Sequence, residues 1–103
     1  MIAADADPLT DPIDWRDSGC VNEIYDQGIC GACWAFSAAA SVATQWCLKT
    51  NVLYNLSEQQ LVDCQRECDG CIGGWSYIGM DYWRLHYAET AETYPYTARE
   101  GAC

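Results

Sequence analysis

Positive charge is scarce in this sequence of 103 residues. Only 5 residues are Lys or Arg against 15 Asp or Glu, so the formal net charge is −10 with the single His neutral. Phosphate backbones and anionic lipids are bound by clustered cations, so we expect no nucleic-acid partner and no membrane partner. The acidic surface is interpreted as a solvated exterior that repels strongly acidic substrates.

Long apolar runs are also missing. The most apolar stretch, residues 33–48, contains Ser, Thr and Gln and is shorter than the about 20 residues that a transmembrane helix needs. The amino terminus turns acidic at Asp5 before an apolar signal-peptide core begins, which indicates a mature form or an engineered truncation. The length suits one domain or half of a larger one, and 5 Trp and 7 Tyr favour a packed core.

Cysteine, in contrast, is abundant. Eight cysteines lie at positions 20, 30, 33, 47, 64, 68, 71 and 103. This density is typical of a disulfide framework in a short chain from an oxidising compartment. We therefore predict a lysosomal, vacuolar or secreted protein.

The spacing of apolar residues predicts a mainly α-helical, disulfide-rich fold. Residues 1–19 are rich in Asp and Pro and are expected to be extended. Residues 1–11 are predicted to form a flexible acidic arm. Residues 12–103 are predicted to form one lobe. A long helix is predicted over 32–49, apolar on nearly all faces, which indicates that a second body covers one flank.

Shorter elements follow the long helix. Residues 52–54 are predicted to be extended, and a third helix is predicted over 75–87. Between them, Ser57 fits the N-cap of a helix that runs through Asp63. In the capping box expected there, the side chain of Gln60 reaches back to the Ser57 amide.

Cys33 stands where a predicted loop gives way to the long helix. The unpaired amides and positive dipole of a helix N-terminus favour the thiolate, the reactive form of cysteine. Gln27 lies six residues upstream, and its carboxamide paired with the backbone N–H of Cys33 makes an oxyanion hole. The pattern indicates nucleophilic catalysis.

The segment QGICGACWAFS at 27–37 resembles the active-site segment of papain-like cysteine peptidases. Four further blocks resemble the family in its order: 14–16, 56–64, 70–74 and 94–96. The resemblance covers residues 12–103 and implies the helical left lobe of the α+β papain-like fold, with the β-rich right lobe absent.

The resemblance also implies site residues. Cys33 matches the nucleophile and Gln27 the oxyanion donor. The implied substrate-binding residues are Gly31, Gly73, Gly74 and Trp75. Among them, Gly73 and Gly74 pair with an extended polypeptide, and Trp75 lines a broad apolar pocket. Ile72 departs from the Asn common at its position, and Ala32 replaces the commoner Ser. No metal or cofactor is implied.

Three disulfides are implied by the same resemblance, the first by cathepsin B-like members: Cys20–Cys47, Cys30–Cys71 and Cys64–Cys103. An alternative pairs Cys64 with Cys68 across a short step and leaves Cys103 over. We favour Cys64–Cys103 because the longer loop restricts the unfolded chain more. Either pairing leaves one odd cysteine besides Cys33.

The general base is missing from these residues. A papain-like peptidase needs a His base with an Asn or Asp to orient it, and the family carries them about 130–150 residues beyond the nucleophile. The only histidine, His86, lies in the predicted third helix and is interpreted as a bystander. We expect a very poor peptidase that depends on a second lobe, from another chain or a deleted segment, or a lobe that self-associates through its exposed helix flank.

Three other functions stay open. The first is an inert binding or decoy module. The second is a redox protein, since Cys30 and Cys33 form a C-x-x-C at a helix start. The third is a zinc site built from Cys64, Cys68, Cys71 and His86.

The sequence also contains a glycosylation sequon, Asn55-Leu56-Ser57. Ser57 is better explained as the helix cap. Occupancy of Asn55 is therefore left open at this stage, as are the substrate preference and the oligomeric state.

Overall fold

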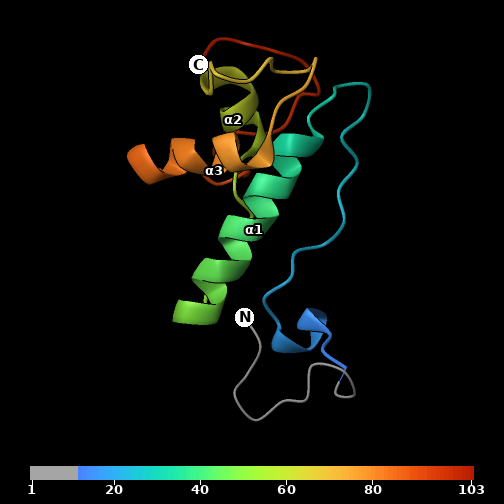
Figure 1. Cartoon of the computed structure of the whole chain (residues 1–103), viewed down its shortest axis with the longest axis vertical. Helices are drawn as coiled ribbons and strands as arrows, with labels where there is room; N and C mark the ends of the chain where they lie inside the picture. Colours follow the sequence, from blue (N-terminus) through green and yellow to red (C-terminus); the bar gives the residue numbers. More distant parts are fainter. Residues whose placement is uncertain (1–11) are drawn as a thin grey trace.

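The lobe is built from three α-helices joined by cross-linked loops. The computed structural model describes residues 12–103, with a short 3₁₀ turn η1 followed by the helices α1 (Cys33–Thr50), α2 (Glu58–Cys64) and α3 (Ser76–Leu85) (Figure 1). No β-strand forms within 12–103, where pairing is limited to two isolated bridges. The mainly α class is confirmed, and the predicted arm at 1–11 lies outside the described residues.

Helix α1 forms over nearly the predicted range because its residues include no Gly and no Pro. It ends at Asn51, which adopts a left-handed conformation with φ 64 and donates its N–H to the Cys47 carbonyl at 2.7 Å. Small residues allow a close crossing with α3, since a Cβ on Gly79 would lie 3.1 Å from that of Ala38. In Figure 1 α3 lies across the amino-terminal end of α1.

The long helix was predicted to be buried on most sides, but in the structure part of α1 is exposed. One face is buried through Trp34, Ala35, Ala38, Ala39, Ala43 and Cys47. On the remaining surface, Trp46 is 52% exposed and Leu48 is 42% exposed. Within residues 12–103 an apolar flank is therefore uncovered, and its covering by a second body stays a prediction.

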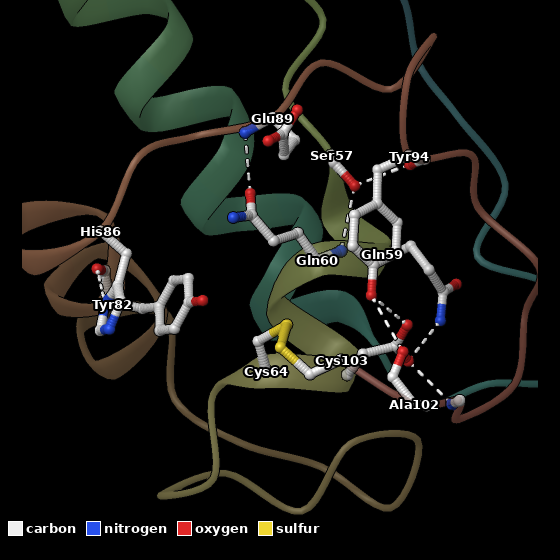
Figure 2. Close-up of a disulfide and its surroundings, with 12 residues drawn as sticks. Ser57, Gln59, Gln60, Cys64, Tyr82, His86, Glu89, Tyr94, Ala102 and Cys103 are labelled. Carbon is white, nitrogen blue, oxygen red and sulfur yellow. Dashed lines mark hydrogen bonds between the residues drawn. A yellow bond between two sulfur atoms is a disulfide. The ribbon is translucent and has the colours of Figure 1, made fainter.

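Helix α2 begins as predicted, but its capping box is different. The Ser57 hydroxyl accepts the Gln60 N–H at 3.0 Å, which confirms Ser57 as the N-cap. The Gln60 side chain does not return to Ser57. Its Oε1 accepts from the Glu89 N–H at 2.9 Å (Figure 2). The same oxygen accepts from Trp83 Nε1 at 2.9 Å, and the Gln60 Nε2 donates to the Tyr87 carbonyl at 2.8 Å. The Ser57 N–H bonds to the Glu89 carbonyl instead.

Two other expected elements are corrected. The predicted extended segment before residue 20 contains η1 (Trp15–Ser18), since Asp14 caps it by accepting the Arg16 N–H at 3.0 Å. The third helix, α3, runs over Ser76–Leu85 and is shorter than the predicted 75–87. Each correction concerns an element end or a turn, where local pattern is weakest.

The loops are held by disulfides at Cys20–Cys47, Cys30–Cys71 and Cys64–Cys103. These are the pairs that the papain-like resemblance implies. Cys33 and Cys68 are free, the first exposed and the second buried. Because Cys64 and Cys71 are both bonded to other cysteines, the four-ligand zinc site is wrong. None of the helices in the described part of the chain is long and apolar enough to cross a membrane.

Candidate active site

Cys33 is the first residue of α1, and its thiol is exposed. Ala32 precedes it as N-cap and offers no side-chain hydrogen bond. The N–H groups of Ala35 and Phe36 both bond to the Ala32 carbonyl, at 2.9 and 3.1 Å. The amides of Cys33 and Trp34 have no such partner within residues 12–103 and belong to the first helical turn, where an anion is stabilised.

Trp34 fixes the start of α1 to the glycine-rich loop. The side chain is only 2% exposed, and Nε1 donates to the Gly70 carbonyl at 3.0 Å. The ring also lies under Gly74, where an added Cβ would stand 2.9 Å from Trp34 Cδ2 and 2.7 Å from the sulfur of Cys68. The backbone of Gly74 therefore rests directly on buried Trp34 and Cys68.

The loop before Cys33 is joined to the same glycine-rich segment. The Cys30–Cys71 disulfide brings their Cα atoms to 4.5 Å, and the Gly31 N–H donates to the Cys71 carbonyl at 2.7 Å. A Cβ on Gly31 would lie 2.6 Å from that carbonyl oxygen, so only glycine fits. Since Cys30 is bonded to Cys71, it forms no dithiol with Cys33, and the redox alternative is wrong.

Gln27 is positioned by the carboxy-terminal segment. Its carbonyl accepts the Tyr96 hydroxyl at 2.5 Å, and the Tyr96 ring packs edge-on against Phe36 of α1 with centroids 4.9 Å apart. Burial raises the pKa of Tyr96, with smaller contributions from the charges of Glu58 and Asp26, so the phenol stays a donor at neutral pH. The carboxamide of Gln27 has no hydrogen-bond partner among the described residues and is available to a ligand.

The predicted substrate-binding residues divide into two groups. Gly31 and Gly74 are packed closely against other residues: Gly31 contacts the Cys71 carbonyl, and Gly74 contacts Trp34 and Cys68. Gly73 has φ 155 with open space at its Cβ position, and its carbonyl accepts the Asp69 N–H at 2.8 Å. Trp75, just before α3, is 67% exposed. The strip at residues 73–75 thus consists of the backbone of two glycines followed by an exposed indole.

His86 lies far from this edge. It stacks on Tyr82 with ring centroids 4.2 Å apart, and it lines a cavity of about 470 Å³ together with Trp46. Trp46 stands thirteen residues along α1 from Cys33, about 20 Å at 1.5 Å per residue. His86 therefore does not serve as the base for Cys33. This agrees with its interpretation as a bystander from the sequence.

No anchoring role was predicted from the sequence for Trp34 or for Tyr96. For Trp34 the available signal was a Trp directly after a cysteine at the start of a predicted helix. For Tyr96 there was none, because its contact with Gln27 spans 69 residues.

Comparisons with known proteins agree with the geometry of the site around Cys33. The profile of the papain family cysteine proteases matches residues 9–103. The chain belongs to the papain family. Digestive cysteine proteinase 2 of Homarus americanus is 46% identical over 99 residues, which are 93% of this chain and 31% of that protein. Caricain of Carica papaya is 41% identical over 103 residues, which cover this whole chain and 30% of caricain.

Solved structures of papain-like proteases superimpose closely. The Carica candamarcensis cysteine protease CMS1MS2, in complex with E-64, gives a TM-score of 0.86 at 38% identity and covers 88% of this chain and 43% of that one. The ragweed pollen allergen Amb a 11, in its proform, gives 0.88 at 35% identity and covers 97% of this chain and 31% of that one.

This papain-family chain spans less than half the length of each relative described. It corresponds to the amino-terminal, helical lobe of the fold. The relatives are cysteine proteases, and this lobe carries a free, exposed thiol on the first residue of α1.

Proposed function

We propose that this lobe provides the nucleophilic half of a cysteine endopeptidase, with Cys33 as nucleophile and Gln27 as oxyanion donor. The supporting observation is an exposed, unbonded thiol on the first residue of α1, with two open backbone amides beside it. Buried structural cysteines are inert, whereas a thiol at such a helix start is a favourable nucleophile.

The reaction passes through an acyl-enzyme in two stages, acylation of Cys33 and hydrolysis of the thioester. The Cys33 thiolate attacks the carbonyl carbon of a peptide, and a C–S bond forms while the carbonyl oxygen takes up negative charge. The Cys33 N–H and the Gln27 carboxamide stabilise that oxyanion. The C–N bond then breaks, and the amine leaves with a proton from an acid. Water loses a proton to a base and forms a C–O bond to the thioester carbon, and the C–S bond breaks to return the thiolate.

The acid and base for these proton transfers must come from outside these residues. His86 is the only histidine in the sequence and lies at the far end of α3. A second lobe, supplied by another chain or by a further segment, brings the His and Asn, and in its absence the exposed flank of α1 favours self-association. The lobe alone is a very poor peptidase.

The substrate is an extended polypeptide. Its backbone pairs with the strip around Gly73 and Gly74, and an apolar side chain two residues before the scissile bond contacts Trp75. Three disulfides and the names of the digestive relatives support a lysosomal, vacuolar or secreted location.

An activated peptidyl ester tests this half-site without the missing acid, because its phenolate leaving group departs unprotonated. The oxidised lobe is mixed with the ester, and phenolate release and intact protein mass are followed together. We expect one acyl group on Cys33 and no turnover of the matching peptide amide. The Gln27→Ala variant acylates about 100-fold more slowly, the loss typical of removing one oxyanion donor.

Matched variants give the controls. Cys33→Ala takes up no acyl group, and Cys68→Ser acylates at the rate of the parent, since Cys68 is buried under Gly74. Acylation that is absent from the parent, or equal in Gln27→Ala, overturns the proposal in favour of an inert binding module. Sustained amide hydrolysis by the pure monomer overturns the dependence on a second lobe.

A further inference from the structure

The sequon at Asn55 occupies a surface position with an ordered side chain. Asn55 is exposed, and its Oδ1 accepts from Asn22 Nδ2 and from the Tyr25 hydroxyl, both at 2.9 Å. Its Nδ2 has no partner among residues 12–103. An N-linked sugar replaces one hydrogen of Nδ2 and leaves Oδ1 unchanged. The folded lobe therefore accommodates a glycan with both hydrogen bonds retained.

The third sequon residue is in the opposite situation. Ser57 is 0% exposed. Its hydroxyl donates to the Tyr94 carbonyl at 2.7 Å and accepts the Gln60 N–H at 3.0 Å (Figure 2). Its backbone N–H donates to the Glu89 carbonyl at 2.9 Å. Once these bonds form, no glycosylating enzyme can engage the hydroxyl that it needs for recognition. Modification of Asn55 must precede the docking of residues 89–94.

The order of synthesis provides that interval. Glu89 and Tyr94 follow Ser57 by 32 and 37 residues, which takes about 2–7 s at about 5–20 residues per second. Cys103, which forms a disulfide with Cys64 at the end of α2, is synthesised later still. The sequon is therefore held in an open chain for seconds before its cap can close.

We propose that Asn55 is an N-glycosylation site, modified during synthesis before Ser57 caps α2. The donor is a lipid diphosphate-linked oligosaccharide. A bond forms between Nδ2 and the anomeric carbon, the bond from that carbon to the diphosphate breaks, and one Nδ2 proton is released. The inference is independent of the role proposed for Cys33 and rests on entry into the secretory pathway, where disulfides such as these form.

The glycan has a physical use at this position. Val52, Leu53 and Tyr54 directly precede Asn55 and are 44%, 37% and 46% exposed. A bulky, hydrated sugar on Asn55 lies over this apolar segment and opposes its self-association.

The test is expression of the chain behind a cleavable signal in insect cells, followed by peptide mapping with and without peptide-N-glycosidase. That enzyme converts a glycosylated asparagine to aspartate, so it marks the site. We expect the mark at Asn55 in most of the protein and complete loss of the glycan in Asn55→Gln. Ser57→Thr keeps a hydroxyl, so its glycan is retained. Asn22 and Asn51 lack a hydroxyl residue two positions on and serve as internal negative controls.

A second measurement separates the proposed timing from simple access. A reducing agent added during synthesis delays the Cys64–Cys103 bridge and the docking of the terminal segment, so glycan occupancy at Asn55 should rise or stay complete. Unmodified Asn55 in protein whose three disulfides have formed overturns the proposal, whatever the result of acylating Cys33. A fall in occupancy under reduction overturns the proposed order of events.

Discussion

Trp34 Nε1 donates to the carbonyl oxygen of Gly70 at 3.0 Å, and this bond joins the residue after the free thiol to the start of the glycine-rich loop. Both residues are buried. The same indole supports Gly74 from below. One side chain thus sets the position of α1 relative to the strip that is proposed to bind substrate.

Removing this bond should weaken both the lobe and the site. We expect Trp34→Phe to cost about 2–3 kcal/mol of unfolding free energy, because the Gly70 carbonyl is left buried without a donor and the smaller ring leaves a void. Chemical denaturation measures the loss. The control on the same helix is Trp46→Phe, whose side chain is 52% exposed and whose cost should be about 0.5 kcal/mol or less. Equal losses in the two variants would contradict the anchoring role.

Gly31 should tolerate no side chain. In Gly31→Ala the new Cβ meets the Cys71 carbonyl oxygen at 2.6 Å, so the loop must move and the Gly31–Cys71 hydrogen bond is lost. Thermal unfolding should show a cost of about 1–3 kcal/mol. Gly101→Ala is the matched control, since its Cβ finds its nearest atom at 3.6 Å. A neutral Gly31→Ala variant would show that the two loops are not held in contact.

Glu58 should make stability depend on pH. Burial raises the pKa of its carboxyl above 4.5, partly offset by a hydrogen bond from its own backbone N–H. A carboxyl whose pKa is raised by folding stabilises the fold below its ordinary value, and that stabilisation is lost as the pH rises through the folded pKa. Glu58→Gln should therefore raise the melting temperature at pH 7 and leave it nearly unchanged at pH 3.

The control for this pH effect is Glu67→Gln, which removes one exposed carboxylate from the loop after α2. Its melting temperatures at the two pH values should follow those of the parent. If Glu58→Gln behaves in the same way as Glu67→Gln, the buried carboxylate does not govern the pH dependence.

Local patterns predicted the helices better than their connections. The absence of Gly and Pro over residues 33–50 and the hydroxyl of Ser57 act within a few residues of themselves, so both were read correctly. Gln60 was not, because Trp83 and Glu89 supply partners from 23 and 29 residues away. The turn at Trp15–Ser18 was not predicted, because it depends on a single N-cap residue, Asp14.

The candidate site shows the same division. Cys33 and Gln27 lie in one contiguous segment with a helix start, and the roles proposed for them rest on residue type, spacing and the family resemblance. The supports of that segment, Trp34 against Gly70 and Tyr96 against Gln27, are set by tertiary packing. The disulfide pairs came from the family resemblance, since eight cysteines alone leave many pairings open.

Native-state alkylation tests the central claim most directly. The oxidised protein is treated briefly with iodoacetamide, and its peptides are mapped without reduction. We predict label on Cys33, none on buried Cys68, and intact bridges at Cys20–Cys47, Cys30–Cys71 and Cys64–Cys103. Cys33 recovered in a disulfide, or left unlabelled under conditions that label Cys68, would contradict the account.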